Sequence, residues 1–202
     1  MRRFAILIYG LTISVLLCAA FSVDAAPVGF VATLTGPAEV PPTPSPGTGT
    51  AHVNFDVVAH TLEVEVTFQG LISPTIASHI HCCLPPPPAT QVAPVATTLP
   101  TFPGFPLGVT SGSYHQTFDT TLASTYNPAF ITAHGGTPGS AEADLFAGMV
   151  AGLTYLNIHT SQFPGGEIRG TLLATPEPGT LLLLAAGIAG LARRLRRNRF
   201  VN

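Results

Sequence analysis

Residues 51–69 read AHVNFDVVAHTLEVEVTFQ, and this stretch decides the fold class. Two apolar series with a period of two run through it, first Val53, Phe55 and Val57 and then Leu62, Val64, Val66 and Phe68. Polar residues fill most positions between them, so each series has one apolar and one polar face, as in a half-buried β-strand. Only residues 58–60 separate the two series, which predicts a β-hairpin.

Weaker strand signals continue on both sides of the hairpin, at residues 29–35, 76–81, 113–120, 154–160 and 167–173. Short strands at such intervals are typical of sandwiches and barrels, whose apolar faces are buried against each other. The sequence therefore predicts an all-β fold, an antiparallel Greek-key-like sandwich or barrel of about seven strands.

Two segments depart from the strand pattern. Residues 84–112 are rich in proline, which lacks the N–H group that a sheet needs, and this predicts a long extended loop. Phe102, Phe105 and Leu107 within it favour a loop packed on the body. Residues 140–150 (SAEADLFAGMV) combine a capping serine, early acidic residues and apolar positions at helical spacing, so we expect a short helical insertion.

Charged residues make up 9% of the 202 residues, and the cations among them gather at the ends of the chain. There is no lysine, and seven of the eight arginines lie in residues 2–3 or 193–199, which leaves Arg169 as the one cation of residues 27–175. Eight acidic side chains give these residues a net charge of −7 with neutral histidines. Phosphate neutralisation requires several cations on one face, so a nucleic-acid partner is excluded.

Residues 1–26 have the three regions of a secretory signal peptide. Two arginines precede an apolar run over residues 4–21, and the small residues Ala25 and Ala26 offer the cleavage site. The run predicts a helical targeting segment. We therefore expect a protein exported from the cytoplasm, with residues 27–174 as its folded domain.

Residues 175–202 contain a second targeting segment. Twelve apolar or glycine residues at 181–192 would form a helix of about 18 Å, which is short against a bilayer core of about 30 Å. A basic stop follows, made of Arg193, Arg194, Arg196, Arg197 and Arg199. The positive-inside rule holds these arginines on the cytoplasmic side. The segment is interpreted as a sorting tail, or alternatively as a tail anchor with snorkelling arginines.

This tail resembles the PEP-CTERM sorting signal of Gram-negative bacteria that secrete exopolysaccharide. The motif Pro176-Glu177-Pro178, the apolar segment and the basic stop occur in the family's order. In that family an exosortase, a membrane-embedded cysteine transpeptidase-like enzyme, reads the motif. The resemblance implies an exosortase-type partner, transient membrane contact before processing, and delivery to the cell surface, the outer membrane or the extracellular matrix.

Most of the remaining chain resembles the CHRD domain, which is named for the repeats of chordin. The resemblance rests on residues 30–42 (FVATLTGPAEVPP), 77–81 (ASHIH), 155–160 (YLNIHT) and 163–170 (FPGGEIRG). Bacterial members of this family are exported single domains. The chain departs from the family pattern after His81, where cysteines stand in place of the usual glycine.

The histidines are the candidate chemical groups. His79 and His81 lie two residues apart on a predicted strand and so point to one face, and His159 shares a face with Tyr155 and Asn157 on another strand. If the two strands are neighbours, three imidazoles converge, which is the ligand number of a zinc or copper site with one open position. Alternatively, hydrogen bonds with the backbone and with a carboxylate such as Glu167 or Glu39 make His79 and His159 structural.

The same three histidines carry a resemblance to Cu/Zn superoxide dismutase. That protein is a Greek-key sandwich with a His-x-His strand and long loops over its metals, and here His79, His81 and His159 would take the ligand positions. The resemblance implies a metal-dependent redox activity as the alternative to a protein without catalysis or cofactor.

Cys82 and Cys83 are adjacent and would lie in an oxidising compartment. They can form a vicinal disulfide within the chain, bridge two chains, or offer a thiolate to a metal beside His81. We expect the internal disulfide.

Arg169 lies in an acidic body, so we expect a structural ion pair with a nearby carboxylate. Glu167 is the nearest acidic residue in the sequence, and Glu39 and Asp56 are alternatives. Ligand recognition is the other interpretation of this arginine.

Together these features predict an exported surface or matrix protein with a binding or structural role. Exopolysaccharide or other surface proteins are the expected partners, and four aromatic residues are candidates either for stacking on sugars or for the core: Phe102, Phe105, Tyr114 and Tyr126. The alternative is a periplasmic or surface protein that binds zinc or copper.

Overall fold

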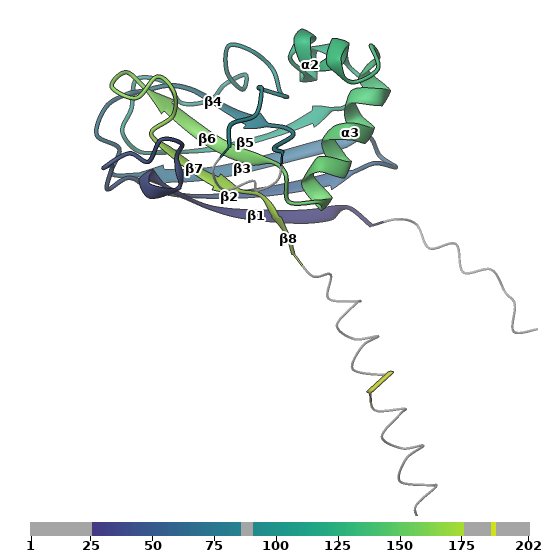
Figure 1. Cartoon of the computed structure of the whole chain (residues 1–202), viewed down its shortest axis with the longest axis horizontal. Helices are drawn as coiled ribbons and strands as arrows, with labels where there is room; N and C mark the ends of the chain where they lie inside the picture. The colour runs from purple at the N-terminus through teal and green to yellow at the C-terminus, as the bar shows by residue number, and fades with distance from the viewer. Residues whose placement is uncertain (1–25, 86–90, 176–186, 189–202) are drawn as a thin grey trace, which may run out of the picture.

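The computed structural model describes residues 26–85, 91–175 and 187–188 (Figure 1). Its strands are β1 (Val28–Thr35), β2 (Thr48–Asp56), β3 (Thr61–Gln69), β4 (Thr75–His81), β5 (Gly112–Asp119), β6 (Tyr155–Thr160), β7 (Ile168–Thr171) and β8 (Leu173–Ala174). Its helices are the short turns η1 (Gly36–Ala38) and η3 (Ala123–Thr125), then α2 (Pro128–Ala133) and α3 (Pro138–Val150). The all-β prediction is confirmed.

All strands belong to one antiparallel sheet that curls into half a barrel (Figure 1). The order is β4-β6-β7-β1-β2-β3-β5, with β8 paired to the start of β1. After the β2–β3 hairpin the chain crosses to the opposite edge to form β4, and β5 returns to lie beside β3. This crossover places β4 next to β6, two strands that lie far apart in the sequence.

The hairpin at residues 51–69 forms as its periodicity predicts. Val53 pairs with Val64 across β2 and β3, and both side chains are fully buried. His52 and Asn54, which alternate with them, are exposed on the other face. Each buried aliphatic side chain of this kind contributes about 1.5–3 kcal/mol to stability, so the alternation fixes which face of the sheet points inward.

Helix α3 and the proline-rich loop close the concave side of the sheet. Leu145 and Met149 of α3 are fully buried in the same core as the hairpin, and so is Phe102 from the loop, with Phe105 nearly so. The loop therefore packs on the body as predicted, although Leu107 is 50% exposed and takes no part in the core. Every buried member of this core lies between residues 30 and 172.

Helix α3 begins earlier than the sequence indicated. Thr137 is its N-cap and forms a capping box with Ser140, so the serine expected as the cap lies inside the helix. Glu142 is buried, and its carboxylate accepts hydrogen bonds from His60 and Thr120. The acidic residue expected to favour the start of the helix therefore joins α3 to the β2–β3 turn. Helix α2 was not predicted.

Both predicted targeting segments fall largely outside the described residues. Of the predicted signal peptide at residues 1–26, the structure describes residue 26 alone. The described residues include neither the motif Pro176-Glu177-Pro178 nor the five arginines of the basic stop. The last residue of the described body, Thr175, donates its amide and its hydroxyl to the carbonyl of Gly29 at 2.8 and 3.0 Å. Among the described residues, no helix has the length and apolar character needed to cross a membrane.

Candidate metal centre

Three histidines from two neighbouring strands meet on the face of the sheet that points away from the core. His79 and His81 lie on β4, His159 lies on β6, and the two strands pair antiparallel. Ile80, between the first two, is fully buried in the core. The ligand atoms of the three imidazoles all lie within 4.8 Å of one another. The structure thus brings together the residues that the two-residue strand period placed on one face.

Each imidazole is oriented by a backbone carbonyl of a loop. The three contacts are His79 Nε2 to Pro100 O at 2.7 Å, His81 Nδ1 to Ala93 O at 2.8 Å and His159 Nδ1 to Pro164 O at 2.9 Å. A carbonyl only accepts hydrogen bonds, so the nitrogen facing it carries the proton. In a neutral imidazole the other nitrogen is then a bare lone pair. All three lone pairs face the same small space.

Burial keeps these rings neutral. The exposed fractions of His79, His81 and His159 are 5%, 7% and 9%. Desolvation lowers the pKa of His79 and of His81 to about 4, although hydrogen bonds to the carbonyls oppose the shift. Desolvation also lowers the pKa of His159. Neutral imidazole is the form that binds a metal ion.

The distances between the lone pairs fit a transition metal after a small adjustment. Tetrahedral bonds of about 2.1 Å place two nitrogen ligands about 3.4 Å apart. His79 Nδ1 and His159 Nε2 are already 3.2 Å apart. His81 Nε2 has no hydrogen-bond partner among the described residues, so its movement toward the other two nitrogens breaks no hydrogen bond at that atom. Zinc and copper are among the metals that imidazole ligands suit.

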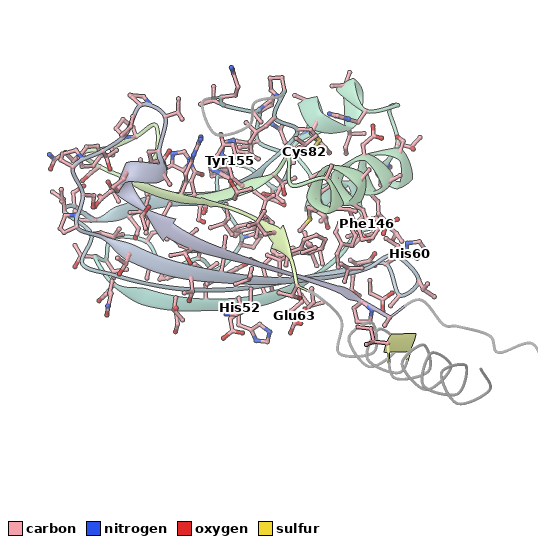
Figure 2. All side chains as sticks on the ribbon, turned by 60° about the horizontal axis from the view of Figure 1, so that its bottom comes forward. His52, His60, Glu63, Cys82, Phe146 and Tyr155 are labelled. Atoms are coloured by element: carbon pink, nitrogen blue, oxygen red, sulfur yellow. A yellow bond between two sulfur atoms is a disulfide. The ribbon has the colours of Figure 1, made fainter. Side chains whose placement is uncertain are left out.

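Polar side chains surround the three histidines. Tyr155 stacks on His81 with the ring centroids 4.5 Å apart, and the Arg169 guanidinium lies 4.5 Å from the centroid of the Tyr155 ring. Asn157 lies on β6 between β4 and β7, opposite both His79 and Arg169. Figure 2 shows Tyr155 on the opposite side of the body from His52 and Glu63, so the cluster is separate from the exposed histidines of the hairpin.

Glu39 is a buried carboxylate near this cluster, and its pKa is strongly raised. It follows η1 and is 4% exposed. Burial raises its pKa to about 7, although the positive charge of Arg169 and hydrogen bonds from Val40 and Asn157 lower it. Its Oε1 atom has no hydrogen-bond partner within the described part of the chain.

The predicted ion pair between Arg169 and Glu167 is wrong. Arg169 donates from Nε to Ala38 O at 2.6 Å and from Nη1 to Gln91 O at 3.1 Å. Glu167 lies just before β7 and is fully buried, and its carboxylate accepts three hydrogen bonds of 2.6 Å from Ser45 Oγ, the Ile72 amide and Thr160 Oγ1. Because neutral donors satisfy the acid and carbonyls satisfy the cation, the two side chains stabilise different loops.

Cys82 and Cys83 are joined by a disulfide directly after His81. In this state neither sulfur is a thiolate, so neither can serve as a metal ligand or bridge to a second chain. Both sulfurs face Gly148 of α3, where an added Cβ would lie 2.6 Å from Cys82 Sγ and 2.7 Å from Cys83 Sγ. The disulfide therefore connects the end of β4 to the helical insertion by direct packing.

The four aromatic residues considered for sugar stacking belong to the core. Phe102, Phe105, Tyr114 and Tyr126 are between 0% and 6% exposed. Phe102 stacks on Tyr114 with the ring centroids 5.7 Å apart. No face of these rings is free to stack on a sugar, so of the two interpretations the core is correct.

Two family models match this chain. Residues 30–172 match the CHRD domain. The chain belongs to the CHRD family. Residues 174–197 match the PEP-CTERM protein-sorting motif, so this CHRD protein carries the signal of an exported, exosortase-processed protein. The resemblances to the CHRD domain and to the PEP-CTERM signal noted in the sequence are confirmed. No curated protein and no solved structure shows significant similarity to the chain.

Two residues of the candidate centre were missed as site residues. Asn157 shares a face with His159 because the two lie two apart on β6, so the same periodicity that selected the histidine contained the signal. Glu39 comes from a loop 118 residues before Asn157, and nothing in the local sequence placed it there. Its position depends on the packing of η1 against β7.

Proposed function

We propose that this CHRD protein is an exported metal-binding module that holds one zinc or copper ion through His79, His81 and His159. The observation that carries the proposal is the convergence of three imidazole lone pairs, each fixed by a backbone carbonyl behind the ring. A metal-binding histidine usually donates a hydrogen bond from the ring nitrogen that does not bind the metal. This bond sets the tautomer and the orientation of the ring.

Other occupants satisfy the three lone pairs less well. A proton on one ring is disfavoured because burial lowers the pKa of all three histidines. A water molecule offers two hydrogens for three acceptors. A metal ion of the size and charge of zinc or copper satisfies three nitrogen ligands and leaves one position open.

The proposed role is binding rather than catalysis. The three ligands are at most 9% exposed and are covered by the loops that supply Ala93, Pro100 and Pro164. A site covered in this way suits retention of a metal ion better than turnover of a large substrate. We further propose that the sorted protein remains at the cell surface or in the extracellular matrix, in contact with exopolysaccharide or other surface proteins, after transient membrane contact through its tail.

Metal content of the purified, exported full-length chain tests the proposal. We expect about one zinc or copper ion per chain by elemental analysis, and loss of the ion in the His79→Ala/His81→Ala double variant. The matched control is His52→Ala/His115→Ala, which removes two exposed histidines of the β2–β3–β5 surface. A folded protein that stays free of metal when zinc or copper is added would refute the proposal.

A further inference from the structure

Two buried oxygen atoms beside the three histidines have no partner within the described chain, namely Glu39 Oε1 and Asn157 Oδ1. Glu39 is 4% exposed and Asn157 is 1% exposed, so bulk water does not satisfy either atom. Native proteins seldom leave a buried acceptor unpaired, and each exception requires an explanation. Two acceptors in one cluster indicate a ligand that donates two hydrogen bonds.

The two acceptors belong to neighbouring side chains, and one of these lies beside His81. The Glu39 carboxylate interacts with the Asn157 amide next to Gly166. The Asn157 side chain also interacts with His81. Glu39 is not among the side chains whose ligand atoms gather within 4.8 Å of one another. Glu39 therefore reaches the metal position only through another group.

A surface cleft of about 230 Å³ ends at Glu39. It is lined by residues 39–41, Thr43 and residues 162–166, which include Pro164, the residue whose carbonyl holds His159. Gly166 has a φ of +129°, and an added Cβ there would collide with Glu39 Oε1 and lie 2.8 Å from Asn157 Nδ2. A glycine at this position keeps the floor of the cleft close to both polar side chains.

We propose that Glu39 and Asn157 hold an exchangeable water molecule on the open position of the metal, and that the cleft beside Gly166 is the route by which this water exchanges. This inference rests on the proposed metal site. The chemistry is matched, because the two hydrogens of a water molecule satisfy the two acceptors while its oxygen binds the metal. The ligand class is thus a small hydrogen-bond donor, with water as the simplest member.

Water-proton relaxation of the full-length chain loaded with copper(II) alone tests the inference. An exchangeable water on the paramagnetic ion raises the relaxation rate of the solvent, and we expect this increase in the parent protein. Glu39→Leu removes one acceptor at similar volume, and Gly166→Ala places a methyl group against Glu39 Oε1. Both variants are expected to lose the increase while keeping one copper per chain. The matched control is Gly165→Ala, whose added Cβ has no neighbour within 4 Å.

The outcomes separate the two proposals. A parent protein that binds copper through the three histidines but leaves solvent relaxation unchanged overturns the inference and leaves the metal site intact. Equal relaxation in the parent protein, Glu39→Leu and Gly166→Ala also overturns it. A chain that binds no copper overturns both proposals. Because Gly166→Ala also strains the backbone, Glu39→Leu carries the test if the glycine variant does not fold.

Discussion

Replacement of Gly148 by alanine should destabilise the protein, although the same change usually strengthens a helix. Gly148 lies within α3, and an alanine Cβ there would meet the sulfurs of Cys82 and Cys83 at 2.6 and 2.7 Å. Ordinary van der Waals contact begins at 3.4 Å, so the helix and the disulfide must separate by most of an ångström. Overpacking of this kind costs about 1–3 kcal/mol, and the gain in helix propensity offsets up to about 1 kcal/mol of it.

Gly139 provides the matched control, because it lies in the same helix and an added Cβ there has no neighbour within 4 Å. Gly139→Ala should therefore stabilise the protein by up to about 1 kcal/mol. The two variants should differ by about 2 kcal/mol, the middle of the overpacking range. In a domain of this size that corresponds to about 4–8 °C in Tm.

Urea unfolding followed by circular dichroism measures both variants, and equal m-values confirm that only stability has changed. In a Cys82→Ala/Cys83→Ala background, Gly148→Ala should instead stabilise the protein through its higher helix propensity. The sulfurs that would meet the new methyl group are absent there. If Gly148→Ala is as stable as Gly139→Ala when the disulfide is intact, the packing of α3 on the disulfide is refuted.

Three further predictions concern the metal, a buried acid and a surface acid. At a free zinc concentration of about 100 times Kd, the free energy of unfolding of the parent protein should rise by about 2.7 kcal/mol. Calorimetry should then show that zinc raises the Tm of the parent protein and of the control His115→Ala but not the Tm of His159→Ala. Glu167→Gln should cost at least about 1.5 kcal/mol in urea unfolding, because an amide cannot accept all three hydrogen bonds made to the carboxylate; wild-type stability would contradict this. Hydrogen bonds lower the pKa of Glu63, the larger effect coming from Asn54 and the smaller from His115. In NMR titrations this pKa should therefore rise toward 4.5 in Asn54→Ala and rise less in His115→Ala. No rise in either variant would contradict these two hydrogen bonds as the cause.

The sequence was most informative where structure depends on local periodicity. The hairpin at residues 51–69 alternates strictly, so its two strands and its buried face could be read directly. The pattern at residues 167–173 was read as one strand, whereas β7 ends at Thr171 and β8 begins at Leu173. Leu172 between them is fully buried and donates its amide to Thr154 O, just before β6, whereas Leu173 and Ala174 pair with β1.

The candidate metal centre could be predicted in part for the same reason. The period of two placed His79 and His81 on one face, and only the pairing of β4 with β6, a non-local fact, was needed to add His159. The carbonyls that orient the rings come from loops, whose path is fixed by tertiary packing rather than by propensity. Charge arithmetic likewise showed that Arg169 was the only central cation but could not show that carbonyl oxygens are its partners.

The pairing of β8 with β1 determines how the molecule is presented once it is held by its tail. Thr175 is bonded to Gly29, and Pro176 of the sorting motif follows directly, so any tether transmits its pull to the start of β1, a strand in the middle of the sheet order. In the sheet order β7 and β6 lie between β1 and β4. At the usual strand spacing β1 and β4 are therefore about 14 Å apart. In Figure 1, β8 lies at the bottom of the body, and β4 lies above β6 and β7. A protein grafted to a surface through Thr175 would accordingly hold the edge that carries His79 and His81 away from that surface.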